Sequence, residues 1–207
     1  MRARISGNEK ASLFAKKILQ IGEGTFPVDE SSDQITLSNE LCNLVKTPEL
    51  IYKIYPNIRQ NYVNSEWFYE RSILATKNEI VNSINETIQD MIPGAVKIYY
   101  SIDTTINENE SVNFPTEFLN SLDIPGMPLH CLKLKVGSPI ILLRNLNSPQ
   151  LCNGTRLCVK QLQNNVIKAK ILTGKDKVNT VFIPRIPLIS NEMSINFKRL
   201  QFPVKLA

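Results

Sequence analysis

The stretch GSPIILLRNLNSPQLCNGTRLCV, residues 137–159, contains two apolar runs separated by a segment rich in Asn, Ser, Pro and Gly. Apolar runs of this length favour β-strands, and the polar segment between them favours turns. The Asn153-Gly154 pair suits a tight turn with a positive φ angle, which would set the register of the flanking strands. We therefore expect this stretch to be β-scaffold rather than a catalytic loop or a metal clip.

The segments around this stretch alternate between apolar and basic residues. Leu132, Leu134 and Val136 alternate with Lys133 and Lys135; Leu157 and Val159 alternate with Arg156, Cys158 and Lys160; Ile167, Ala169 and Ile171 alternate with Lys168 and Lys170. A period of two predicts strands with one apolar and one basic face. With turns expected at 146–150, 163–165 and 173–177, four or five short strands between 130 and 184 predict a small β-barrel or curled sheet.

The segment SILATKNEIVNSINETIQDMIPG, residues 72–94, indicates a different arrangement. Ser72 to Ala75 have the composition of a short buried strand, and Thr76 with Glu79 forms a possible capping box for a helix that ends at Pro93-Gly94. The run VKIYYSI at 96–102 favours a further strand. Strand, helix and strand in this order predict a βαβ unit with a parallel sheet. The apolar face of the helix would hold Ile80, Ile84, Ile88 and Met91.

Short helices are expected before this segment. Asn8 can cap a helix that ends at Gly22, Ser38 can cap a second, and Thr47-Pro48 can begin a third that ends before Pro56. Polar composition predicts loops at 23–36 and 103–113, and the second of these loops is acidic.

Charge is distributed unevenly over the 207 residues. Residues 130–207 contain 13 Lys and Arg and two acidic residues, a net charge of +11, whereas residues 1–129 contain 11 basic and 17 acidic residues, a net charge of −6. A basic region of this kind favours a polyanionic partner, most simply nucleic acid, although a solvated lysine-rich face is the alternative. The candidate contacts with single-stranded DNA are Lys133, Lys135, Arg144, Arg156, Lys160, Lys168 and Lys170.

The expected binding is weak and independent of sequence. Neutralising about five phosphates would give a salt slope of about −3.5 on a single strand. Aromatic residues that could stack on bases are scarce, because Phe182, Phe197 and Phe202 are the only ones beyond residue 129.

Several kinds of site find no support in the sequence. None of the eight glycines lies in a phosphate-binding loop, and the spacing of Cys42, Cys131, Cys152 and Cys158 does not suit zinc, so structural thiols and no metal site are expected. His130 and Cys131 would point to opposite faces of a strand, which argues against a catalytic pair. No apolar run approaches the roughly 18 residues of a membrane helix and no secretory signal is visible, so a nuclear or cytoplasmic location is expected.

Several segments, in order, resemble the carboxyl-terminal part of the Pif-type DNA helicases of superfamily one, especially those carried by Helitron transposons. They are MRARISG (1–7), ERSILATKNEIVNSIN (70–85), FPTEFLNSL (114–122), LHCLKLKVGSPIILLRNLNSPQLCNGTRLCVKQL (129–162), VIKAKILTG (166–174), VFIPRIPL (181–188) and FKRLQFPVKLA (197–207). Thr76 and Lys77 depart from the family's pattern, which has proline and threonine there.

This resemblance implies an α/β fold with three parts. Residues 1–128 would be a partial second RecA-like motor domain, residues 129–188 an inserted small β-barrel resembling Src-homology-three domains, and residues 189–207 a return segment into the motor domain. The implied activity of the full-length protein is ATP-dependent DNA unwinding in DNA repair, recombination or telomere maintenance, with ATP and Mg²⁺ as cofactors. By resemblance, Arg2 would contact nucleotide phosphates.

The family's phosphate-loop and magnesium motifs belong to the first RecA-like domain, which these 207 residues do not contain. Because phosphoryl transfer needs groups from both domains, we expect no ATPase activity and no cofactor for this chain alone, with the first domain as its missing partner. A stand-alone nucleic-acid or protein interaction module derived from a transposon helicase, or a non-functional gene fragment, are the alternatives.

Overall fold

The computed structural model describes residues 9–37, 42–43, 45–106, 114–174, 179–190 and 196–207. The chain divides into two compact units, residues 1–49 and residues 50–207. The first contains helix α1 (Glu9–Gly22) and an isolated bridge between Asp29 and Gln34. α1 confirms the first predicted helix, although its proposed Asn8 cap and the Ser38 helix start lie outside the described residues.

Four helices precede the strands of the second unit and form what we call the helical layer. They are α2 (Thr47–Ile54, which begins in the first unit), α3 (Ile58–Asn61), α4 (Ser65–Tyr69) and α5 (Asn78–Met91). The Asn64 side chain caps α4 by accepting hydrogen bonds from the backbone N–H groups of Glu66 and Trp67, at 3.0 and 3.4 Å. The rings of Trp67 and Phe68 then meet edge to face, with centroids 5.2 Å apart.

The predicted βαβ unit is wrong. α5 is the expected helix, but its N-cap is Lys77, whose side chain makes no capping bond, so Thr76 and Glu79 do not form the predicted box. Residues 72–75 form no strand, and Leu74 is 92% exposed. A strand requires a neighbour to satisfy its backbone groups, and every strand pair in the described part of the chain is antiparallel, so this segment has no parallel partner.

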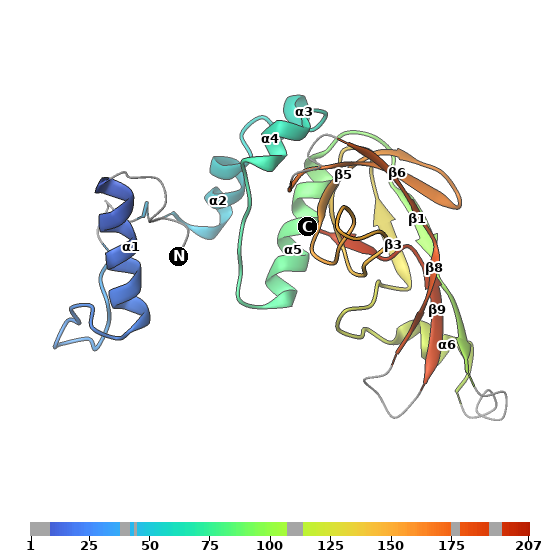
Figure 1. The fold of residues 1–207 in the computed structure, drawn as a ribbon, viewed down its shortest axis with the longest axis horizontal. Helices are drawn as coiled ribbons and strands as arrows, with labels where there is room; N and C mark the ends of the chain where they lie inside the picture. Colours follow the sequence, from blue (N-terminus) through green and yellow to red (C-terminus); the bar gives the residue numbers. More distant parts are fainter. Residues whose placement is uncertain (1–8, 38–41, 44, 107–113, 175–178, 191–195) are drawn as a thin grey trace. The chain divides into compact units, whose positions relative to one another are not determined.

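The β-region contains three antiparallel sheets (Figure 1). Its elements in chain order are β1 (Lys97–Tyr100), β2 (Ile102–Thr105), α6 (Thr116–Ser121), β3 (Cys131–Leu134), β4 (Pro139–Leu142), β5 (Arg156–Leu162), β6 (Val166–Ile171), β7 (Thr180–Pro184), β8 (Ile186–Ile189), β9 (Phe197–Gln201) and β10 (Val204–Leu206). The sheets have the orders β1-β3, β10-β4-β5-β6-β7 and β2-β9-β8. The described part of the chain is a mixed α/β arrangement with no closed barrel, so of the two predicted forms, a small barrel or a curled sheet, the barrel is not found.

One strand occupies part of the predicted acidic loop. β2 covers residues 102–105, whereas residues 107–113 lie outside the described part. Its buried Asp103 forms a bidentate ion pair with Arg199 of β9, in which the shortest N–O distance is 2.7 Å. Arg199 also donates to the carbonyl oxygens of Leu119 and Pro128. The ion pair explains how an aspartate can lie in a buried strand, because each charge is paired and hydrogen-bonded.

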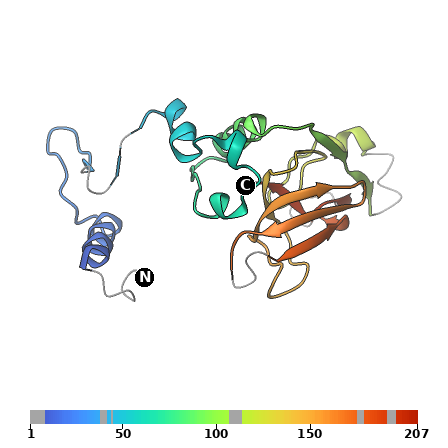
Figure 2. The same ribbon diagram turned by 90° about the horizontal axis from the view of Figure 1, so that it is seen from above.

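Figure 2 shows strands of the five-stranded sheet running side by side. One face of this sheet is aliphatic and buried, as predicted. Leu157 and Val159 of β5 and Ile167 of β6 are fully buried in this core. The predicted turn is also confirmed at Gly154, whose φ angle is +86°, with the Thr155 N–H donating to the Cys152 carbonyl oxygen at 3.0 Å. The terminal strand β10 pairs with β4 in the same sheet.

Candidate nucleic-acid interface

The outer face of the sheet β5–β6–β7, opposite its aliphatic core, carries most of the basic residues predicted to bind DNA. Cross-strand pairing places Cys158 beside Lys170 and Lys168 beside Phe182. Residues that are directly opposite each other in antiparallel strands share a face of the sheet. The outer face therefore continues from β5 across β6 to the edge strand β7.

The helical layer covers one part of this outer face, which we call the covered half and which consists of Arg156, Cys158 and Leu172. Cys158 and Leu172 are buried against a cluster that includes Tyr55, Ile58 and Phe68. The Arg156 guanidinium donates to the carbonyl oxygen of Arg71 at 3.2 Å. The expected alternation therefore fails in β5, where residues 157, 158 and 159 are all buried, because both faces of the strand are covered.

The other part of the outer face, which we call the open half, consists of Lys168, Lys170 and Phe182. Both lysines are half-buried, and Phe182 is 60% exposed. The Lys168 ammonium lies 5.9 Å from the centroid of the Phe182 ring. By contrast, Phe197 and Phe202 are fully buried and are not available to a ligand.

Lys160 lies at the boundary between the two halves. It occupies a register shift of β5, between Val159 and Gln161, and its ammonium donates to the carbonyl oxygen of Val63 at 3.0 Å. A lysine has three donors, so this bond leaves two for another acceptor.

Lys135 does not belong to an exposed basic face. It is 8% exposed. Its ammonium donates one hydrogen bond to the carbonyl oxygen of Ile92 at 2.9 Å and a longer one to that of Asp90 at 3.5 Å. A cation at this position complements the free carbonyls at the end of α5. The strand alternation ends at Leu134, so Lys135 turns inward and Val136 is exposed instead.

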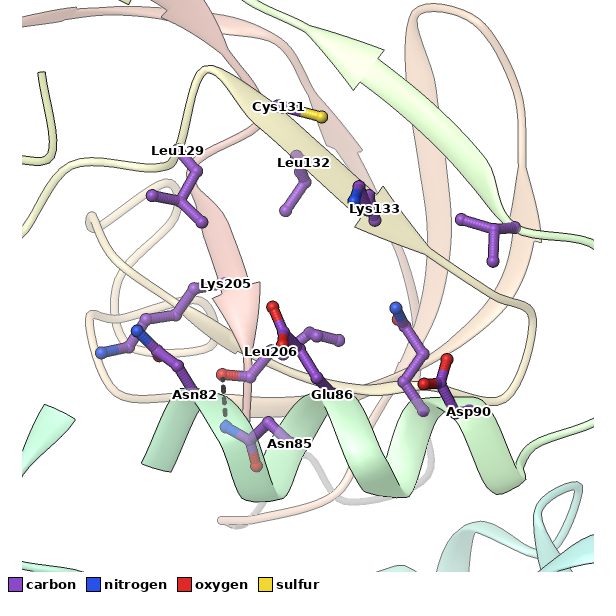
Figure 3. Close-up of a pocket in the computed structure, with 12 residues that line it drawn as sticks. Asn82, Asn85, Glu86, Asp90, Leu129, Cys131, Leu132, Lys133, Lys205 and Leu206 are labelled. Atoms are coloured by element: carbon purple, nitrogen blue, oxygen red, sulfur yellow. Dashed lines mark hydrogen bonds between the residues drawn. The ribbon is translucent and has the colours of Figure 1, made fainter. Parts of the chain in front are cut away.

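Lys133 and Arg144 lie apart from the open half. Lys133 lines a cavity of about 500 Å³ between α5, β3 and β10, together with Glu86, Asp90 and Lys205 (Figure 3). In this cavity the Asn85 amide donates to the carbonyl oxygen of Leu206 at 3.3 Å. Because two carboxylates accompany the two lysines, the cavity is a poorer polyanion site than the open half. Arg144 is half-buried in the segment that follows β4.

Within the described residues, the remaining candidates do not form a second site. Arg2 lies outside the described residues. Burial raises the pKa of the Cys158 thiol. Within the described ranges, no three His, Cys, Asp or Glu side chains come together as metal ligands, and no helix is long and apolar enough to cross a membrane. His130 Nδ1 lies 2.8 Å from Ser101 Oγ, which donates to Asp103, so the histidine belongs to a structural network.

A family profile described as "DNA helicase Pif1, 2B domain" matches residues 117–162, the segment from α6 through β5. This segment, less than a quarter of the chain, is similar to the 2B domain of Pif1 helicases. It contains Lys133, Lys135, Arg144, Arg156 and Lys160 from the predicted set. A search of curated proteins finds no significant match.

Solved Pif1 helicases are similar to the chain at low identity. Bacteroides sp. Pif1 in complex with ADP-AlF4 is 18% identical, with a TM-score of 0.49 over 95% of this chain and 38% of that one. Candida albicans Pif1 is 19% identical, with a TM-score of 0.46 over 85% of this chain and 47% of that one. Bacteroides Pif1 bound to ssDNA is 21% identical, with a TM-score of 0.44 over 81% of this chain and 40% of that one. The chain thus spans less than half the length of each of these helicases.

Proposed function

We propose that these residues are part of a Pif1-type ATP-dependent DNA helicase and that they bind single-stranded DNA weakly, without sequence preference. The open half, extended by Lys160, is the proposed contact surface. The observation that supports it is the placement of Lys168 and Lys170 on one face of β6, with Lys160 at the neighbouring register shift of β5, in strands that contain no acidic residue. Lysines in this arrangement neutralise phosphates without reading bases.

The geometry lowers the expected number of phosphate contacts. Arg156 is bonded to the helical layer and Lys135 is buried, so Lys160, Lys168 and Lys170 remain on the proposed surface. At about 0.7 per neutralised phosphate, three contacts give a slope of log affinity against log salt of about −2. We expect this value rather than the steeper one that the sequence suggested.

Fluorescence anisotropy with a labelled oligothymidylate, titrated from low to high salt, tests this surface. The double variant Lys168→Gln/Lys170→Gln should bind more weakly and lose about 1.4 of the salt slope. The matched control is Lys198→Gln/Lys205→Gln, which removes the same charge from exposed lysines of β9 and β10. Equal losses in the two double variants, or no binding by the unmodified chain at low salt, would contradict the proposal.

The proposed helicase activity requires groups that lie beyond these residues. We expect the chain alone to hydrolyse no ATP, even with single-stranded DNA, because the phosphate-binding loop is absent from its sequence. Turnover that persists through purification and scales with the chain's concentration would overturn this expectation. The role of Arg2 at the nucleotide, the boundaries after residues 128 and 188, the link to Helitron transposons, and roles in repair, recombination or telomere maintenance stay part of the proposal.

A stand-alone interaction module derived from such a helicase is the second candidate. Residues 50–207 contain three clusters of buried hydrophobic residues. These clusters favour the stand-alone module, because they indicate a unit able to fold by itself. Transcript sequence on both sides of the reading frame distinguishes the two candidates. A phosphate-binding loop encoded in frame supports the helicase, and its absence from the complete transcript supports the module.

A further inference from the structure

We infer that Phe182 stacks on an unpaired base and makes the open half selective for single strands over duplexes. This inference rests on the proposed function, because it assigns a second role within the same surface. The lysines there recognise phosphates, which single strands and duplexes both carry. Phe182 would supply the contact that only an unpaired base can make.

The position of Phe182 on β7 presents its ring outward. Burial alternates along this strand, with Val181 and Ile183 in the aliphatic core and Thr180, Phe182 and Pro184 exposed. Among the described strands, β7 is the last of its sheet, so none pairs with its outer edge. A phenylalanine at such a position gains little from folding, because most of its ring remains in water.

The neighbours of Phe182 distinguish it from two other exposed aromatic side chains of the β-region, Tyr100 and Phe118. Tyr100 of β1 is 59% exposed, but its ring lies against His130, and Phe118 of α6 stacks on Phe114. Phe182 instead lies directly opposite Lys168 on the neighbouring strand. Among these three, Phe182 is the aromatic residue that shares a face with the proposed phosphate contacts.

The spacing of the lysines suits a strand of nucleic acid that runs along β6. Lys168 and Lys170 are two residues apart on one face, which corresponds to about 7 Å along a strand. Each ammonium can therefore meet a separate phosphate, while the base beside Lys168 can lie on the Phe182 ring. Stacking of this kind tolerates any base, because every base has a π-face. A base pair inside a duplex has its faces covered by its neighbours, so the same contact is lost.

The test measures the affinity of the full 207-residue chain for three probes with equal numbers of phosphates. The probes are an oligothymidylate, an abasic oligonucleotide and a duplex. We expect Phe182→Ala to lower affinity for the oligothymidylate about 5- to 10-fold, the low end for one stacked base, and Phe182→Tyr to keep it near the unmodified value. Affinity for the abasic probe should be the same in all three proteins, and the salt slope should not change.

The outcomes separate this inference from the proposed function. If the unmodified chain binds the oligothymidylate and Phe182→Ala binds it equally well, the stacking role is wrong and the lysine surface stands. Equal affinity of the unmodified chain for the abasic probe and the oligothymidylate would also overturn stacking. If no probe binds at low salt, both proposals fail. Matching thermal unfolding curves for the three proteins would show that the exposed ring acts on binding rather than on folding.

Discussion

The covered and open halves differ in burial although they belong to the same face of one sheet. In the covered half, Cys158 is fully buried beneath the helical layer. In the open half, Phe182 is 60% exposed although it is the larger and more apolar side chain. Strand alternation thus assigns a residue to one face of the sheet. The elements packed on that face then decide whether the residue is buried in a core or exposed.

The largest expected effect comes from comparing a phenylalanine of the helical layer, which packs on the covered half, with the phenylalanine of the open half. Phe68 of the helical layer is fully buried and contacts both Tyr55 and Trp67, so Phe68→Ala should lower the free energy of unfolding by about 3–5 kcal/mol. Phe182→Ala should change it by less than about 0.5 kcal/mol. Urea unfolding followed by circular dichroism measures both. Similar losses in the two variants would show that the halves are not packed differently.

A glycine tests how closely the helical layer approaches the sheet. Gly137 has a φ angle of +93°, and an added Cβ would collide with the Tyr62 ring. Gly137→Ala should therefore cost about 1–3 kcal/mol from backbone strain and crowding together. The control is Gly174→Ala, because Gly174 has a similar φ angle of +90° and nothing within 4 Å of the added Cβ. If both substitutions have the same effect in urea unfolding, the close approach of Tyr62 is absent in solution.

Lys133 and Lys135 allow the same comparison between an exposed and a buried side chain within one segment. Lys135→Met removes the ammonium that binds the carbonyl at the end of α5, so we expect a loss of about 1–2 kcal/mol. Lys133→Met changes an exposed side chain and should cost less than about 0.5 kcal/mol. Thermal unfolding at matched protein concentration measures both. An unchanged midpoint for Lys135→Met would contradict its role at the helix end.

The smallest expected effect is a difference in the reactivity of the cysteine thiols. Cys158 is buried, whereas Cys42, Cys131 and Cys152 are half-buried, and all four are free thiols. An aromatic disulfide reagent should therefore modify three thiols quickly in the folded chain and the fourth only after urea is added. Rapid modification of Cys158, identified by mass spectrometry, would show that the helical layer opens readily.

The buried thiol of Cys158 also makes the stability of the fold decrease at high pH. Burial raises the pKa of Cys158 above its usual value of 9.0, so the unfolded chain loses this proton at lower pH than the folded chain does. Its contribution to stability is therefore complete below about pH 9 and decreases as pH rises further. Cys158→Ala should show a shallower decline in unfolding midpoint above about pH 9 than the unmodified chain.

Local patterns predicted much of the sheet and the helices α2 and α5, but not the packing of the helical layer on the sheet. The alternation in β6 and the Gly154 turn follow from short-range geometry, so the sequence was sufficient for both. The burial of Cys158 and Lys135 depends on α3, α4 and the end of α5, which lie far from them in sequence. The density of aromatic residues from Tyr52 to Tyr69 was a usable signal that this segment packs as a layer.

The βαβ prediction failed for a related reason. Four residues at 72–75 have the composition of a strand, but composition cannot provide a hydrogen-bonding neighbour. For the candidate site, the sequence placed Lys168 and Lys170 correctly on the face opposite the aliphatic core. It could not separate them from Arg156, because the contact that engages Arg156 is a backbone carbonyl 85 residues away in the chain.

Lysine acetylation with and without oligothymidylate, followed residue by residue by mass spectrometry, tests the division of the outer face most directly. We expect Lys168 and Lys170 to react in the free chain and to be protected by DNA. Lys198 and Lys205 should react equally in both states, and Lys135 should react in neither. Equal modification of Lys168 and Lys170 in both states under conditions where the oligothymidylate is bound, or ready modification of Lys135, would contradict this division.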